Sequence, residues 1–150
     1  MKLFTLAAMV VSAVFIAGAE SPLALYGSVH GSGVTSGGLR YSLSDDVCFD
    51  VSAGAMNSTN PAGESVTGFD VYADAFFFGQ TWGLAAALSS PGGDADNTIT
   101  VGIAYALEKE ISESVYIGVA PSIASVSMEG DADPVIGVLN GWGVYVVLGM

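Results

Sequence analysis

The chain is poor in basic residues, in cysteine and in charge of any kind. It holds three Lys and Arg residues against fifteen Asp and Glu residues, and one histidine. Nucleic-acid phosphates require a basic surface, so this balance argues against nucleic acid as a partner. A lone Cys48 provides neither an intramolecular disulfide nor a cysteine-rich metal site. Charged residues make up 12% of the chain, about half the usual fraction for a soluble domain.

Long apolar runs are also missing after residue 19, which excludes a helical membrane protein, because a spanning helix needs about 20 apolar residues. The early apolar run follows Met1-Lys2 and extends from Leu3 to Ile16. Ala17-Gly18-Ala19 then provides the small-x-small pattern of a signal peptidase site. We predict a signal peptide over residues 1–19, with an uncleaved anchor as the alternative. One domain then covers residues 20–150.

Strict period-two alternation runs through residues 98–107. The odd positions are bulky and apolar: Ile99, Val101, Ile103, Tyr105 and Leu107. The even positions are small: Thr98, Thr100, Gly102, Ala104 and Ala106. Such alternation predicts a strand with two different faces. Because the second face lacks the Lys and Glu residues of a water-soluble sheet, the pattern favours an apolar face toward lipid and a small face toward a narrow lumen.

The alternation recurs along the chain, and we predict eight strands. They cover residues 23–30, 38–43, 47–56, 66–78, 81–89, 98–107, 114–127 and 135–148. The connections over residues 31–37, 57–65, 90–97 and 128–134 are long, 108–113 is moderate, and 44–46 and 79–80 are tight. Long loops on one rim and short turns on the other are the habit of bacterial membrane barrels.

The two tight connections also predict strand register. A three-residue loop places Leu43 opposite Val47 and Tyr41 opposite Phe49, and a two-residue type II′ turn at Gly79-Gln80 places Phe77 opposite Trp82. Apolar residues then face apolar residues across both hairpins. Pro121, inside the seventh strand, predicts a bulge or bend there.

Charged residues well inside the strands all fall on the small face. They are Arg40, Asp50, Asp70 and Asp74. A charge on the lipid face costs about 2–4 kcal/mol at the bilayer midplane. The register places Arg40 directly opposite Asp50, so we predict an interior ion pair, with a solvent-exposed cross-strand pair as the alternative. An acidic lumen predicts weak cation preference if the barrel conducts.

Aromatic residues gather on the apolar face near the short-turn rim. They are Tyr41, Phe49, Phe77, Trp82 and Tyr105. This arrangement resembles one of the two aromatic girdles at membrane interfaces, although aromatic residues are also generally enriched in strands.

The chain resembles small eight-stranded outer-membrane barrels of the OmpA/OmpX type. The resemblance covers nearly all of the mature chain, and it rests on the signal peptide, the alternation of loop lengths and two strand–turn segments. These segments are Leu39-Arg-Tyr-Ser-Leu-Ser-Asp-Asp-Val47 and Gly102-Ile-Ala-Tyr-Ala-Leu-Glu-Lys-Glu-Ile111. The family usually ends on an aromatic residue, whereas this chain ends on Met150.

The resemblance implies an all-β fold, an eight-stranded antiparallel up-and-down transmembrane β-barrel in the bacterial outer membrane, with the lipid bilayer as its partner. It also implies a structural, surface-interaction or minor-permeation role without catalysis. A first alternative is a secreted soluble barrel that binds a small apolar ligand inside, as lipocalins do. A second is an outer-membrane acyltransferase built around His30, which lies near Ser28 and Ser32.

Three further features are weighed as sites. His30 and Cys48 are expected to be structural, because no nucleophile motif surrounds the histidine and no base neighbours the thiol. The long loops repeat the tetrapeptide Gly-Asp-Ala-Asp, which supplies Asp94, Asp96, Asp131 and Asp133. These carboxylates are candidate Ca²⁺ ligands, although neither segment matches a full calcium loop, and solvated acidic loops are the simpler interpretation.

Overall fold

The computed structural model describes residues 22–30, 34–59, 63–93 and 95–149, so the predicted signal peptide lies outside the described residues. The strands are β1 (Leu23–His30), β2 (Thr35–Ser44), β3 (Val47–Thr59), β4 (Ser65–Phe77), β5 (Trp82–Ser90), β6 (Thr98–Tyr105), β7 (Leu107–Ser112), β8 (Val115–Glu129) and β9 (Val135–Leu148). Across the described ranges, no helix has the length and apolar character needed to cross a membrane.

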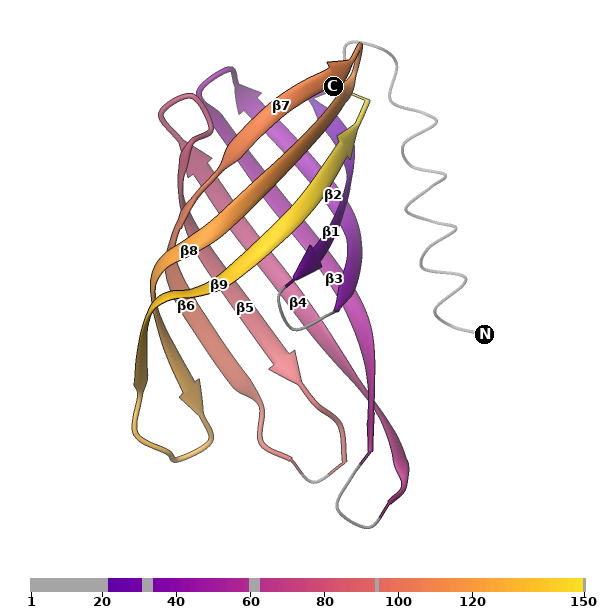
Figure 1. Cartoon of the computed structure of the whole chain (residues 1–150), viewed down its shortest axis with the longest axis vertical. Coiled ribbons are helices and arrows are strands. Elements are labelled where there is room, and N and C mark those ends of the chain that lie inside the picture. The colour runs from indigo at the N-terminus through magenta and orange to yellow at the C-terminus, as the bar shows by residue number, and fades with distance from the viewer. Residues whose placement is uncertain (1–21, 31–33, 60–62, 94, 150) are drawn as a thin grey trace.

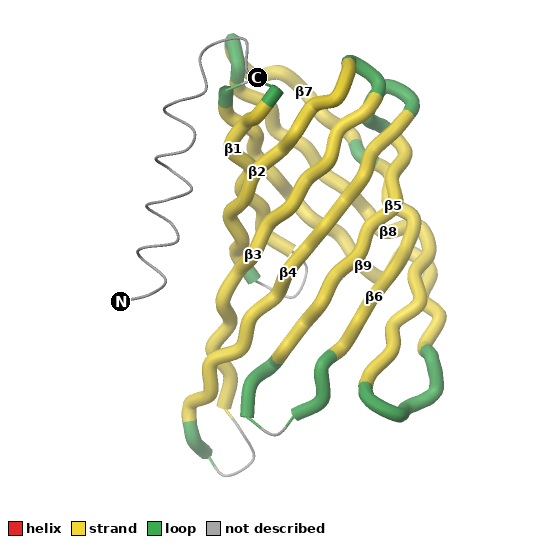
Figure 2. The backbone as a smooth tube through the Cα atoms, turned by 180° about the vertical axis from the view of Figure 1, so that it is seen from behind, coloured by secondary structure: helices red, strands yellow, loops and turns green. Residues whose placement is uncertain are grey.

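The strands form a closed antiparallel barrel with eight strand positions. Consecutive strands pair from β1 to β6 and from β7 to β9, and β9 returns to pair with β1. β6 and β7 share one strand position, because both pair with β8. Tight turns join β2 to β3, β4 to β5 and β7 to β8 at one rim, where β1 begins and β9 ends (Figure 1). The longer connections extend from the opposite rim (Figure 2).

Bulky apolar side chains point out of the barrel and charged side chains point in. Leu84 is 61% exposed and Val51 54%, whereas Arg40 and Asp50 are each 1% exposed and Asp70 3%. This is the orientation that the alternation predicted. Arg40 and Asp50 pair with each other in the lumen, which offsets the cost of burying their charges.

Aromatic rings and glycines alternate on the inward face of neighbouring strands. Phe76 lies opposite Gly83, and Tyr145 lies opposite Gly118. A Cβ atom at Gly118 would stand 2.2 Å from Cζ of Tyr145, and one at Gly83 would stand 2.5 Å from Cδ1 of Phe76. The glycines therefore make room for the rings, which fill a barrel that is too narrow for a ring on every strand.

The predicted moderate loop over residues 108–113 is wrong. The structure interrupts the strand at Ala106 and then continues it as β7, so the connection to β8 is only Glu113-Ser114. The charges of Glu108 and Lys109 imitate a loop, but their backbone pairs with Gly118 and Ile117 of β8.

The predicted long loop over residues 31–37 is also wrong, because β2 begins at Thr35 and pairs with β1 as far as Val29. The Gly and Ser residues of this segment are poor strand formers, so their composition resembles that of a loop.

Turn geometry differs in detail from the prediction. Val47 pairs with Ser44 rather than Leu43, because the register shifts between Ser42 and Ser44. Phe77 does pair with Trp82, but Phe78, Gly79 and Gln80 all have positive φ, so the turn is wider than a type II′ hairpin.

The predicted irregularity in the seventh strand lies two residues beyond Pro121. The register of β8 shifts between Ser122 and Ala124, which leaves Ile123 as an extra residue against β6. The bulge reverses the alternation, so Val126 pairs with the outward Val101 and Ser125 is buried. The proline itself pairs with Trp142.

Candidate functional site

The short-turn half of the lumen is organised around Arg40. The register places this residue opposite Asp50, as predicted, and the guanidinium donates two hydrogen bonds to the carboxylate. Nε donates to Oδ1 at 2.7 Å and Nη2 donates to Oδ2 at 2.8 Å. Two parallel charge-assisted bonds make this among the stronger pair geometries available to a protein.

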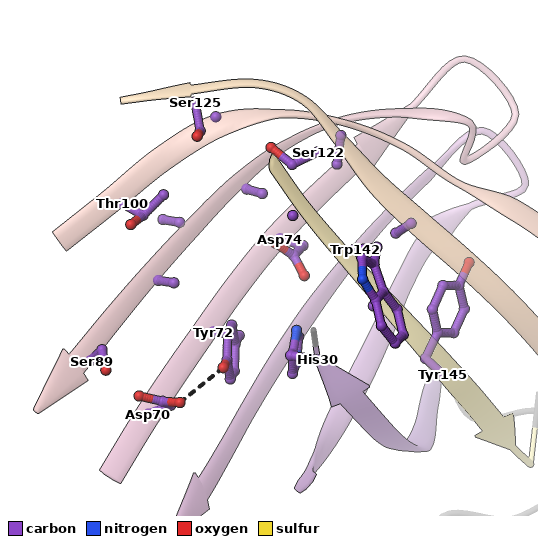
Figure 3. Close-up of a pocket in the computed structure, with 18 of the residues that line it drawn as sticks. His30, Asp70, Tyr72, Asp74, Ser89, Thr100, Ser122, Ser125, Trp142 and Tyr145 are labelled. Carbon is purple, nitrogen blue, oxygen red and sulfur yellow. Dashed lines mark hydrogen bonds between the residues drawn. The ribbon is translucent and has the colours of Figure 1, made fainter. Parts of the chain in front are cut away.

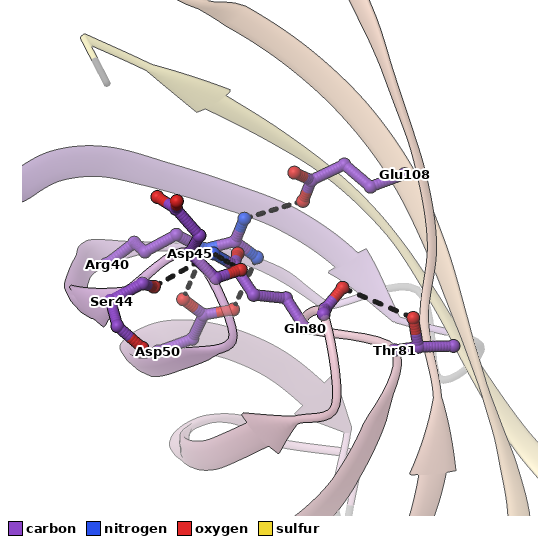
Figure 4. A network of polar contacts seen from close by, with 8 residues as sticks. Arg40, Ser44, Asp45, Asp50, Gln80, Thr81 and Glu108 are labelled. Carbon is purple, nitrogen blue, oxygen red and sulfur yellow. Dashed lines mark hydrogen bonds and ion pairs between the residues drawn. The ribbon is translucent and has the colours of Figure 1, made fainter.

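A second carboxylate reaches the same guanidinium from another part of the barrel wall. Nη1 of Arg40, on β2, donates to Oε2 of Glu108, on β7 (Figure 4). The rings of Tyr26 and Tyr145 lie 5.8 and 5.3 Å from the Arg40 guanidinium carbon. The two rings stack on each other at 5.4 Å between centroids. One cation therefore ties two walls of the barrel together and lies beside a stacked pair of aromatic rings.

The short-turn rim beside this cluster is joined by bonds between turns. The side-chain amide of Gln80 donates to the carbonyl of Asp45, and its backbone N–H donates to the carbonyl of Asp46 (Figure 4). The backbone N–H of Ala106 donates to the carbonyl of Thr81 at the interruption between β6 and β7. These contacts restrain the rim next to Glu108.

A cavity of about 460 Å³ occupies the lumen on the long-loop side of this cluster. Asp70 and Asp74 of β4 line it together with His30 of β1 (Figure 3). The His30 ring stacks on Tyr72 at 3.6 Å between centroids, and the Tyr72 hydroxyl donates to Oδ2 of Asp70 at 3.0 Å. The structure thus gathers two of the predicted lumen carboxylates and the histidine in one space.

Arg40 does not pair with these two carboxylates in any hydrogen bond or ion pair among the described residues. Asp74 lies opposite Asp50 in the strand register and is partly buried. The predicted lumen charge network therefore has two parts, an Arg40 cluster with Asp50 and Glu108, and an acidic cavity with Asp70 and Asp74.

Hydroxyl groups surround His30. Oγ of Ser28 lies 2.8 Å from Nε2 of the histidine, and Oγ of Ser36 lies 2.6 Å from Oγ of Ser28 and 3.0 Å from Oγ of Ser52. This gives the nucleophile–base spacing of an acyltransferase, but among the described residues no carboxylate is hydrogen-bonded to the ring to orient it. Ser32 lies outside the described residues.

Cys48 is fully buried and packs with Phe76, Ala104 and Ala106. It fills space in the short-turn half of the lumen.

The five aromatic residues of the predicted girdle lie on consecutive strands, from β2 to β6. Tyr41, Phe49 and Trp82 are 42, 39 and 46% exposed, while Phe77 and Tyr105 are partly buried. Cross-strand pairs join Tyr41 to Phe49, and Trp82 to both Phe77 and Tyr105. The Trp82 and Tyr105 rings meet edge to face at 4.8 Å.

The two acidic loops lie side by side, since Thr98 pairs with Glu129 and the Asp96 side chain approaches Gly130. Asp96, Asp131 and Asp133 are exposed, and Asp94 lies outside the described residues. Within the described part of the chain, no three His, Cys, Asp or Glu residues gather as a metal site. Calcium binding here stays a prediction.

The sequence pattern does not identify several residues of the interior. It places Glu108 in a loop, and it does not indicate that Tyr26 and Phe76 lie in the lumen. A signal for Glu108 was present, because it continues the small, even-numbered face of residues 98–106 by one more position.

No family model, curated protein or solved structure matches the chain.

Proposed function

We propose that this chain is a small β-barrel protein of the bacterial outer membrane, exported through its N-terminal signal peptide, with a structural or surface-interaction role. The observation that carries the proposal is the belt of exposed apolar side chains around a closed barrel. It includes Val51, Phe69, Leu84, Ile99, Val101, Ile103, Ile117, Val119 and Val146. In water such a belt would promote aggregation, whereas in a bilayer it is the surface that the lipid chains require.

The closure of the barrel supports the same proposal. Every strand position is paired on both sides, so the backbone N–H and C=O groups of the paired strands form hydrogen bonds without water. β1 has only 8 residues, close to the 9–11 residues of a spanning strand, and the bacterial outer membrane is thinner than average. The aromatic residues at the short-turn rim then lie at the level of one membrane interface.

The lumen favours a minor permeation role over an open pore. Arg40, Asp50 and Glu108 cross it, and the rings of Phe76 and Tyr145 fill the short-turn half. We expect small conductance with cation preference, because the cavity is lined by two Asp residues and by no Lys or Arg among its described residues. Planar-bilayer recordings with anion preference would contradict this expectation.

The soluble carrier is the less favoured alternative. It requires an apolar interior, whereas two Asp carboxylates and several Ser and Thr hydroxyls line the cavity beside its aromatic rings. The acyltransferase alternative has the close contact between Ser28 and His30 in its favour. Labelling with a fluorophosphonate, compared between the native chain and His30→Ala, separates it from our proposal, which predicts no His30-dependent labelling.

Cell fractionation tests the location. The proposal predicts that the full-length chain sediments with the outer membrane, resists extraction by alkaline carbonate and is released by detergent. A mature chain that stays in the aqueous fraction, or is released by carbonate alone, would overturn it.

A further inference from the structure

One carboxylate oxygen in the lumen cavity is buried without a hydrogen-bond donor. Asp70 is 3% exposed, and its Oδ1 has no partner among the described residues, while Oδ2 accepts from Tyr72. Burying an acceptor without a donor is unfavourable, and more so when the acceptor is charged. The protein alone therefore leaves the Asp70 carboxylate incompletely hydrogen-bonded, and a positively charged donor that reached Oδ1 would complete its bonding.

Asp74 adds a second carboxylate to the same cavity wall. It lies four residues after Asp70 on β4, so both side chains project from the same face, at positions about 13 Å apart along the strand. No Lys or Arg is among the described residues that line the cavity. The Arg40 guanidinium already donates to Asp50 and Glu108. Two carboxylates thus share one space without a protein counter-charge.

The remaining lining suits an organic ammonium group. Hydroxyls of Ser89, Thr100 and Ser127 provide further acceptors. The volume of about 460 Å³ is in the range of small-molecule sites and far larger than one metal ion needs. Within the described residues, no cluster of three metal-ligating side chains exists. The chemistry therefore favours an amine over a metal.

We propose that the lumen cavity binds a linear aliphatic amine, with one primary ammonium group at Oδ1 of Asp70 and a second at Asp74. An ammonium group supplies three donors and the missing charge, and a chain with two such groups uses both carboxylates. The apolar methylene segment between them lies along the Ala side chains of β5, which also line the cavity. This inference does not depend on the membrane location, because the cavity is inside the barrel in any surroundings.

The test uses the full mature chain refolded in a zwitterionic detergent, with spermidine as the probe and isothermal titration calorimetry as the readout. We expect one saturable site. Asp70→Asn should weaken binding at least 10-fold, and Asp74→Asn should weaken it measurably. The matched control is Asp46→Asn, in the exposed turn between β2 and β3, which should leave the affinity unchanged. Equal affinity in Asp70→Asn and Asp46→Asn would overturn the proposal, because binding would then reflect only the acidic surface.

A thermal measurement on the unmodified chain keeps the proposal falsifiable if a variant misfolds. A ligand that binds only the folded state raises the melting temperature, and the rise grows with the logarithm of its concentration once that exceeds the Kd. Spermidine should raise it more than butylamine, which has one ammonium group, and butanol should have no effect. A rise with Mg²⁺ as large as that with spermidine, or no rise with spermidine, would refute amine recognition. Failure in this assay leaves the membrane proposal standing, since fractionation tests that separately.

Discussion

Replacing Arg40 with Met is expected to destabilise the barrel strongly. The substitution keeps much of the side-chain volume but removes three hydrogen bonds, two to Asp50 and one to Glu108. Asp50 is 1% exposed, so its carboxylate is left buried without its partner. Removing one partner of a buried pair costs about 3–5 kcal/mol, which lowers the folding equilibrium constant by a factor of roughly 10² to 5 × 10³.

The double variant Arg40→Met/Asp50→Leu separates the ion pair from general packing. Because it removes both buried charges, we expect it to recover most of the lost stability and to lie within about 1–2 kcal/mol of the native chain. Lys109→Met is the matched control, since Lys109 is exposed on β7 and should change stability by less than about 0.5 kcal/mol.

Urea unfolding in phospholipid vesicles, followed by tryptophan fluorescence, measures these free energies. Trp82 is about half exposed on the outward face of β5 and should report loss of the lipid environment, whereas Trp142 lines the lumen cavity. The reasoning is refuted if Arg40→Met is as stable as Lys109→Met. It is also refuted if the double variant is less stable than Arg40→Met, because the buried carboxylate would then not be the source of the cost.

Three further predictions concern the outer face, the lumen packing and the loops. Val101→Lys, at the middle of β6 and 44% exposed, should cost about 2–4 kcal/mol in vesicles, whereas Leu43→Lys, at the rim and 62% exposed, should cost about 0–1 kcal/mol. Equal costs would contradict a membrane-spanning belt. Gly118→Val should destabilise by about 1–3 kcal/mol in the same unfolding assay, because a Cβ atom meets the Tyr145 ring, and Tyr145→Ala should relieve part of that loss. Millimolar Ca²⁺ should raise the melting temperature and protect the loops from protease if Asp96, Asp131 and Asp133 contribute ligands with Asp94; no change in either measurement removes the calcium prediction.

The two faces of most strands could be predicted from the sequence, because closing a sheet into a barrel leaves the period-two alternation of each strand unchanged. The exception is β8, where the bulge reverses the alternation. Leu84, Val101 and Ile103 lie outside, and Asp50 and Asp70 lie inside, as their positions in the alternation require. The Arg40–Asp50 contact could be predicted because a tight turn fixes the register of the two strands. The prediction was wrong by one residue at Leu43, beside the turn, but the pairing of Arg40 with Asp50 is as predicted.

Contacts across the lumen could not be predicted in the same way. Glu108 is 68 residues from Arg40 in the sequence. The two side chains meet only because the closed barrel is narrow enough for them to reach each other across the lumen. The extra residue at Ile123 depends on how β8 meets two different partners, β6 and β9, which no local pattern encodes. The stacking of His30 on Tyr72 likewise depends on closure rather than on neighbours in the chain.

Solvent and oxygen accessibility of spin labels along β5 most directly tests whether the apolar face meets lipid. In a Cys48→Ser background, single cysteines at Leu84, Ala85, Ala86 and Ala87 carry the label, and the protein is inserted into vesicles. We predict that collisions with oxygen peak at positions 84 and 86, and that collisions with a polar nickel chelate are lowest there. Nickel accessibility that peaks at 84 and 86, or a uniform profile along the four positions, would contradict the account.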